Sequence, residues 1–332
     1  MTDGRSKRHQ QLSMENPSCS SMSTPQCVYP VAGHAQVVST NEANAGRLTG
    51  PLVSVIVPTR NSGRFLATCL KSIRCQSYKS IEIIVVDNHS TDNTLEIAAR
   101  FADIIAATGP ERSAQVNLGA KMASGTYVFR VDSDFRLETE VIEECVSLVE
   151  HGADAVVVHN TADASVSLIS RVRKFEVDMY KHSLDHTCAR FLSRELYLAI
   201  GGLREDVTAG EDYDFQNRLR RSDVTIETAE AEAVHLDEPR HLLPLLRKYF
   251  QYGGDFRNYR GYNRSESMIQ LSFIRRDYLR NWQAFIRQPI IGTLFVGYHT
   301  LKFAAGGMGY ACGSLKSGWR SPISAIRVRS RS

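Results

Sequence analysis

Short, almost wholly apolar runs alternate along the chain with longer amphipathic segments. The runs at 53–58 (VSVIVP) and 81–87 (IEIIVVD) are rich in β-branched residues and end at polar turns, which is typical of buried parallel strands. Between them, the segment 64–76 places its apolar residues on one face at helical spacing. Strand, helix and strand in this order predict a βαβ unit.

The same alternation continues for about seventy residues beyond this unit. It predicts helices and strands in turn at TLEIAARFA, ADIIAAT, SAQVNLGAKMA, TYVFRVDSD, EVIEECVSLVEHG and ADAVVVH. The predicted fold class is therefore α/β with a mainly parallel central sheet flanked by helices. Because ligands of such sheets bind outside the carboxyl ends of the strands, the polar residues after each strand are the first candidates for a site.

Composition divides the chain into three parts. Residues 1–50 are polar, lack a hydrophobic period and contain no apolar segment like that of a secretory signal, so we expect a disordered leader. Residues 51–239 hold the predicted sheet, and residues 240–332 form a basic, aromatic-rich and helical-looking extension. Seven cysteines without a CxxC pair indicate a reducing, cytoplasmic compartment.

The formal net charge of +4 hides a strong asymmetry between these parts. Of 40 Lys and Arg and 36 Asp and Glu, 16 basic and 3 acidic residues lie from 240 onward, which leaves 24 basic and 33 acidic residues before it. The extension therefore suits an anionic surface, and its interleaved arginines and aromatic residues favour the headgroup layer of a membrane over nucleic acid. An ordinary solvated basic face remains the alternative.

One apolar stretch in the extension, Ile290–Tyr310, has a length that can span a bilayer. His299 and Lys302 fall inside it, and three glycines weaken its end. We therefore expect a re-entrant or surface-lying helix and peripheral contact with the membrane.

Polar residues follow the first two predicted strands. Pro58, Thr59 and Asn61 come after the first, and Asp87 ends the second. Helix capping explains part of the second cluster, but it does not use Asp87. A carboxylate at the end of a buried strand can accept paired N–H groups from a planar ligand such as a nucleobase.

Asp132 and Asp134 stand two residues apart after another apolar run. Two carboxylates at this spacing can share a hard divalent cation that also binds phosphates, or they can form a solvated turn. Arg112 lies near a predicted helix start, where it can dock a phosphate, although it can equally be a surface arginine.

Further along, Glu211 and Asp212 belong to a group of three acids that exceeds what helix capping needs. One of them can act as a general base toward an attacking hydroxyl. His235 follows a predicted short strand and is either a metal ligand or a partly buried polar residue, and Arg190 is a candidate for the acceptor side.

In order along the chain, these motifs resemble glycosyltransferase family 2, the inverting enzymes of GT-A fold. The resemblance covers roughly residues 52–237 and rests on PTRN, DNHSTDNT, VDSD and GED. It implies a nucleotide-sugar donor, a UDP- or GDP-sugar, with Pro58, Thr59 and Asn61 beside the nucleoside and Asp87 bonded to the base. It also implies that 51–239 is a GT-A catalytic domain.

The resemblance further implies roles for the acidic residues of these motifs and for His235. Asp132 and Asp134 match the DxD motif, which binds ribose and a Mg²⁺ or Mn²⁺ ion, and His235 matches a later metal-binding histidine. Asp212 matches the family's base, with Glu211 as the neighbouring fallback. Processive members carry QxxRW after this pair, whereas this chain has QNRLR at 216–220, which implies transfer of a single sugar.

The resulting hypothesis is a metal-dependent, inverting glycosyltransferase at the cytoplasmic face of the membrane. Its acceptor is the hydroxyl or phosphate of a glycan or of a polyprenyl-linked molecule, and no nucleic acid is expected as a partner. Two alternatives stay open: an inactive module that binds nucleotide sugar or lipid, and a nucleotidyltransferase of similar fold.

Overall fold

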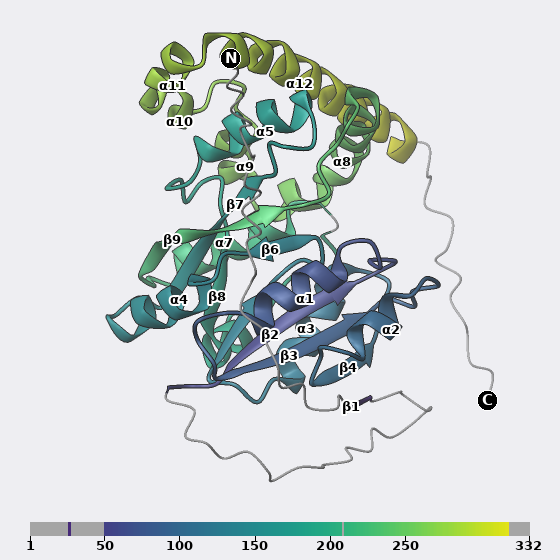
Figure 1. Ribbon diagram of the computed structural model, residues 1–332. Helices are drawn as coiled ribbons and strands as arrows, with labels where there is room; N and C mark the ends of the chain where they lie inside the picture. Colours follow the sequence, from purple (N-terminus) through teal and green to yellow (C-terminus); the bar gives the residue numbers. More distant parts are fainter. Residues whose placement is uncertain (1–25, 28–49, 208, 319–332) are drawn as a thin grey trace, which may run out of the picture.

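The computed structural model describes residues 26–27, 50–207 and 209–318 (Figure 1). Nearly all of the leader expected at 1–50, and the basic tail after 318, lie outside the described residues. The described strands form one nine-stranded sheet in the order β1-β4-β3-β2-β5-β8-β7-β9-β6. Their bounds are β1 Gln26–Cys27, β2 Val53–Thr59, β3 Ile81–Asp87, β4 Ile104–Ala107, β5 Tyr127–Arg130, β6 Phe135–Leu137, β7 Ala155–Ala162, β8 Ala189–Ser193 and β9 Ile226–His235.

The sheet is mainly parallel. β2 pairs in parallel with both β3 and β5, β3 with β4, and β7 with β9. β8 is antiparallel to both of its neighbours, β5 and β7, and β6 is antiparallel to β9. The α/β class and the two strands predicted first are therefore confirmed, with β2 and β3 paired from Val53↔Ile81 to Thr59↔Asp87.

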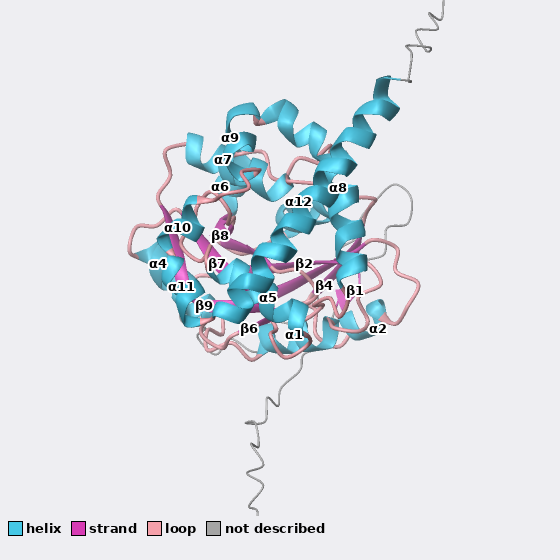
Figure 2. Cartoon of the chain, turned by 90° about the horizontal axis from the view of Figure 1, so that it is seen from above, coloured by secondary structure: helices cyan, strands magenta, loops and turns pink. Residues whose placement is uncertain are grey.

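Helices cover both faces of the sheet (Figure 2). Because side chains alternate across a strand, Val53, Val55 and Val57 pack on one face with α1 (Leu66–Arg74) and α4 (Val141–Glu150). Ile56 points to the other face, toward α3 (Arg112–Met122), α6 (Arg194–Ala199) and α7 (Glu211–Arg221). The short α2 (Thr94–Ala98) follows β3.

A third apolar cluster joins the C-terminal helices to α5 (Leu168–Asp178) above the sheet. These helices are α8 (Leu242–Tyr262), α9 (Arg264–Gln270), α10 (Arg276–Arg280), α11 (Trp282–Arg287) and α12 (Pro289–Gly318). α8 and α12 lie side by side so closely that a Cβ on Gly309 would stand 1.8 Å from the carbonyl oxygen of Phe250. Among the described residues, none of the helices has the length and apolarity needed to span a membrane.

Candidate active site

The ends of β2 and β3 bring together the residues predicted to face a nucleoside. The Thr59 hydroxyl donates to Asp87 at 2.9 Å, and both the backbone N–H and the hydroxyl of Ser90 donate to the same carboxylate at 2.8 and 2.6 Å. Asn61 has a φ of 50° and accepts from the backbone N–H of Thr91 at 2.8 Å. Asp87 is therefore buried and accepts three hydrogen bonds at the carboxyl edge of the sheet.

Next to this edge, three arginines and three carboxylates converge from α3, β5, β8, α7 and the turn that follows β5. Arg112 at the start of α3 bonds Asp132 at 3.2 Å and also Glu211. Arg190 on β8, expected from the sequence on the acceptor side, bonds the other oxygen of Asp132 at 2.8 Å and so lies beside a residue predicted for the donor.

The same arginine cluster also surrounds Asp212 in the first turn of α7. Arg130 at the end of β5 donates to one Asp212 oxygen at 2.6 Å. Arg112 and Arg190 reach the other oxygen at 3.8 and 3.6 Å. Arg112 and Arg190 therefore each bridge Asp132 and Asp212, which lie 80 residues apart in the chain.

Charge and burial set the protonation of these acids. Burial alone would raise the pKa of Asp132, but the charges of Arg112, Arg190 and Arg130 bring it well below its usual value. For Asp212, burial is likewise outweighed by Arg130, Arg112 and Arg190, so the pKa is lowered. The pKa of Glu211 is instead raised, by burial and by the charge of Asp212. The pKa values of these two neighbouring carboxyls are thus shifted in opposite directions, and Asp212 ionises more readily than Glu211.

The backbone before Asp212 depends on a glycine. Gly210 caps α7 with a φ of 92°, a left-handed conformation that side chains rarely adopt. A Cβ at this position would also stand 2.9 Å from the ring of Tyr259 in α8. Tyr259 is fully buried and its hydroxyl accepts from Asn217 in α7 at 3.0 Å. The start of α7, which carries Glu211 and Asp212, is therefore fixed against α8.

Asp134 lies beside the predicted histidine. β6 and β9 pair Phe135 with His235, and His235 Nε2 stands 3.2 Å from Asp134 Oδ2. Its Nδ1 bonds Glu238 at 2.7 Å, and Arg173 of α5 lies 2.9 Å from that carboxylate. Burial alone would lower the pKa of His235, but Asp134 and Glu238 raise it to about 9.

The donor set at this position is compatible with a divalent cation. Asp134 offers carboxylate oxygens, His235 offers an imidazole nitrogen, and Glu238 fixes the ring from the opposite side, which is the usual arrangement behind a metal-binding histidine. The third predicted ligand, Asp132, is held by arginines instead. Within the described ranges, no three His, Cys, Asp or Glu side chains are close enough together to hold a metal by themselves.

The sequence did not single out Arg130, Glu238 or Arg173 as site residues. Arg130 is 6% exposed, and within the described part of the chain its Nε and Nη2 have no hydrogen-bond partner. Its position in the sequence could have revealed it, because Arg130 stands inside an otherwise apolar strand two residues before Asp132. A buried cation requires an acid nearby. Glu238 and Arg173 had no such local signal.

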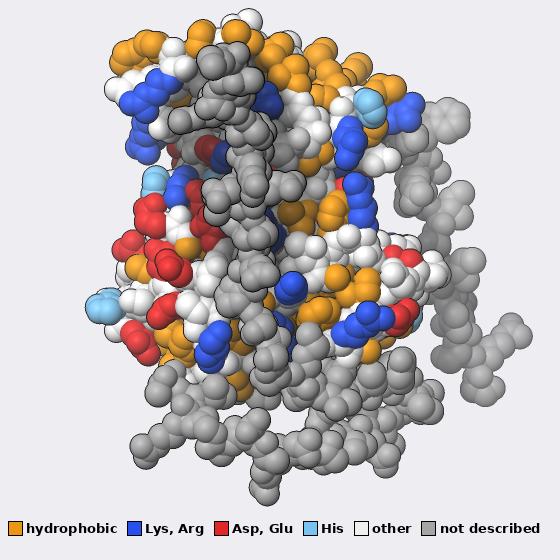
Figure 3. Space-filling model, viewed as in Figure 1, with side chains coloured by type: hydrophobic (Ala, Val, Ile, Leu, Met, Phe, Trp, Pro, Cys, Tyr) orange, Lys and Arg blue, Asp and Glu red, His pale blue; other side chains and the backbone are white. Residues whose placement is uncertain are grey.

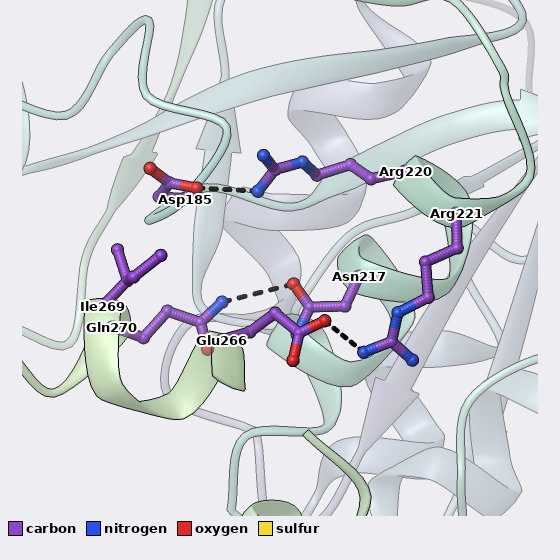
Figure 4. Close-up of a pocket in the computed structure, with 7 residues that line it drawn as sticks. All are labelled: Asp185, Asn217, Arg220, Arg221, Glu266, Ile269 and Gln270. Atoms are coloured by element: carbon purple, nitrogen blue, oxygen red, sulfur yellow. Dashed lines mark hydrogen bonds and ion pairs between the residues drawn. The ribbon is translucent and has the colours of Figure 1, made fainter. Parts of the chain in front are cut away.

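A pocket lies elsewhere, between the second half of α7 and α9 (Figure 4). Arg220 pairs with Asp185 at 2.7 Å, Arg221 pairs with Glu266, and Asn217 bonds Gln270 at 3.4 Å. None of its lining residues belongs to the arginine–carboxylate cluster. Since ligands of such sheets bind outside the carboxyl ends of the strands, we assign the chemistry to the strand ends.

The fold and this site define the class of protein. The structure is similar to that of the mannosyltransferase PcManGT from Pyrobaculum calidifontis in complex with GDP-Man and Mn²⁺, with a TM-score of 0.52, 19% identity and 81% of each chain covered. The fold is therefore GT-A, as expected from the motifs. Residues 54–202, a little under half of the chain, match the model of glycosyl transferase family 2, the family that the sequence motifs resemble.

The curated relatives that the chain matches are glycosyltransferases. The chain is 36% identical over 116 residues to the glycosyltransferase GlyG of Streptococcus pneumoniae, a match that covers 33% of this chain and 38% of GlyG. It is 28% identical over 183 residues to a PGL/p-HBAD biosynthesis glycosyltransferase of Mycobacterium bovis, covering 52% and 70%. The matched segment thus spans little more than a third of the first of these relatives.

Proposed function

We propose that this protein is an inverting glycosyltransferase that moves a single sugar from a UDP- or GDP-sugar to an acceptor at the cytoplasmic face of the membrane. The acceptor group is a hydroxyl or phosphate of a glycan or polyprenyl-linked molecule. The observation that carries the proposal is the position of Asp212: an ionised carboxylate at a helix start, sharing Arg112 and Arg190 with Asp132.

The arginine cluster is suited to the diphosphate of the donor. Guanidinium groups bind phosphate oxygens in pairs, and a nucleoside diphosphate gains negative charge as it departs. The nucleoside lies toward Pro58, Thr59, Asn61 and Asp87, at the neighbouring strand ends. The GDP-Man complex of a protein with the same fold supports a nucleotide sugar as the donor.

Asp212 is the proposed base. It takes the proton of the acceptor hydroxyl while the acceptor oxygen forms a bond to the anomeric carbon. The bond from that carbon to the phosphate oxygen breaks, the nucleoside diphosphate leaves, and the configuration inverts. In the free protein the arginines hold the pKa of Asp212 low. A donor diphosphate that takes over Arg112 and Arg190 would raise that pKa and make Asp212 a better base. Glu211 is the fallback.

Asp134 and His235, together with Asp132, are the proposed ligands of Mg²⁺ or Mn²⁺. When bound, such an ion neutralises charge on the leaving diphosphate. Glu238 holds the imidazole of His235 through Nδ1, which leaves Nε2 directed at Asp134.

The test is a donor panel. The full-length protein is incubated with UDP-, GDP- and dTDP-sugars, Mn²⁺ and a lipid extract, and the released nucleotide is identified. Release of a nucleoside diphosphate from one donor, stimulated by the extract, is expected. Release of pyrophosphate would indicate a nucleotidyltransferase, and donor binding without any release would indicate a binding module.

A further inference from the structure

The C-terminal helices expose an unusual amount of apolar side chain. Of the nineteen large hydrophobic residues that are exposed in the described part of the chain, all but Leu168 and Leu198 lie between Leu243 and Met308. Figure 3 shows this concentration as hydrophobic side chains along the edge where Figure 1 places α11 and α12. A patch of this kind on a globular protein marks a surface that contacts something else.

Helices on a protein surface usually expose charged side chains and bury apolar ones, but α12 exposes an uncharged face and buries its lysine. Every exposed position from Pro289 to Cys312 is uncharged, over about six turns. The histidine and the lysine of this stretch, His299 and Lys302, are buried, and Lys302 pairs with Glu176 of α5. The sequence suggested that these residues weaken an apolar helix, but they leave its outer face uninterrupted.

Cations border this apolar face. Arg276, Arg280 and Arg287 are exposed on α10 and α11, beside Leu279, Trp282 and Ile286.

Acidic residues add little opposing charge. From 240 to 318 the acids are Asp255, Glu266 and Asp277; Glu266 pairs with Arg221, and Asp277 is buried. The surface therefore joins an uncharged apolar strip to positive charge.

We infer that the outer face of α12, with α10 and α11, lies in the headgroup layer of an anionic lipid bilayer. Apolar side chains enter the acyl boundary while arginines contact lipid phosphates, as in interfacial helices. α12 lies in the plane of the membrane, because its opposite face is packed on α8 and α5. The inference rests on the proposed function, since a bilayer would present a lipid-linked acceptor to the domain.

Vesicle binding tests the inference without any turnover. The full-length protein is floated with phosphatidylcholine vesicles, with and without about one-third phosphatidylglycerol, at low and high salt. The test variant carries Ile290→Asp and Leu301→Asp, at side chains that are 76% and 46% exposed. The matched control carries Leu168→Asp and Leu198→Asp, at exposed apolar residues of α5 and α6.

We expect binding to the anionic vesicles, weakened at least about tenfold in the test variant and unchanged in the control. Replacing Arg276, Arg280 and Arg287 by Gln should remove the preference for anionic lipid and the salt dependence. Equal binding by test and control variants, or no binding by the wild type, would overturn the inference. So would a wild-type dimer that Ile290→Asp and Leu301→Asp dissociate without vesicle binding, because a second copy would then cover the face. Nucleotide release in the donor panel is scored separately, so failure of one proposal leaves the other standing.

Discussion

Two clusters of buried charge in this molecule use the same kinds of side chain differently. At the strand ends, Arg112 and Asp212 are 40% and 27% exposed, and the arginines divide their contacts between several acids at 2.6–3.8 Å. Beneath α12, Glu176 and Lys302 are 4% and 8% exposed and pair directly.

The second cluster is closed by its own hydrogen bonds. Tyr180 and Tyr278 both donate to Glu176, at 2.9 and 3.4 Å, and His299 bonds the carbonyl of Phe273 at 2.9 Å. Burial would raise the pKa of Glu176, but Lys302 and Arg275 lower it to about 2. Exposure and shared partners suit the first cluster to exchange contacts with a ligand, whereas burial and direct pairing suit the second to hold helices together.

Replacing the proposed base, Asp212, should have the largest effect of any change in the first cluster. In Asp212→Asn we expect nucleotide release to fall about 10³-fold, because the amide cannot take a proton, while the donor dissociation constant changes little. Glu227→Gln, at an exposed site on β9, is the matched control. Steady-state kinetics and calorimetric donor binding measure the two quantities. Full turnover in Asp212→Asn would move the base to Glu211 or elsewhere.

Breaking the buried pair of Glu176 and Lys302 should lower the stability of the fold rather than the rate of nucleotide release. Lys302→Met leaves the Glu176 carboxylate buried without its cation, and we expect a loss of roughly 3–5 kcal/mol in the free energy of unfolding. Adding Glu176→Gln should recover part of this loss, and Lys248→Met on the exposed side of α8 should cost little. Denaturant titration provides the values. A loss below about 1 kcal/mol in the single variant would show that the pair does not hold α12 to α5.

The buried cluster around Glu176 and Lys302 should also make the free energy of unfolding sensitive to mild acid. Burial and the charge of Lys302 lower the pKa of His299 to about 4, so the folded protein keeps it neutral while the unfolded chain takes up a proton near pH 6.5. The unfolded state then binds more protons, and stability falls as pH drops from 6.5 toward 4, by about 2 kcal/mol at pH 5.

His299→Gln isolates this contribution. The amide can still donate to the Phe273 carbonyl but cannot titrate, so stability should fall less steeply between pH 6.5 and 4. His186, whose pKa is lowered to about 3 by burial and by Arg275, keeps contributing in the same direction. An unchanged pH profile in His299→Gln would assign the acid sensitivity to other groups.

The smallest effect should come from replacing Arg112, one of the arginines that Asp132 and Asp212 share at the strand ends. In Arg112→Gln we expect the donor dissociation constant to rise about tenfold, because one phosphate-binding guanidinium is lost. Binding of the corresponding nucleoside without phosphates should stay unchanged, since Asp87 and Thr59 lie apart from Arg112. Equal losses for donor and nucleoside would mean that Arg112 supports the fold of the site rather than the diphosphate.

The sequence predicted what depends on local pattern. β2 and β3 are apolar runs that end at Thr59 and Asp87. Asp132, after β5, and Asp212, at the start of α7, lie within reach of the same arginines. It did not predict the pairing of Arg130 with Asp212, because these residues are 82 positions apart and no periodicity connects them. The roles of His299 and Lys302 were equally hidden, since only the packing of α12 on α5 shows which way they face.

The contact between Tyr259 and Gly210 has a consequence for dividing the chain. A polypeptide that stopped at residue 239 would retain every acidic residue of the candidate site. It would lose Tyr259, whose ring packs against Gly210 at the start of α7. The glycine and the turn carrying Asp212 would then be open to water, free to sample other conformations. We therefore expect the smallest unit with the proposed activity to extend at least through α8, and partial proteolysis after β9 to abolish nucleotide release even if the sheet survives intact.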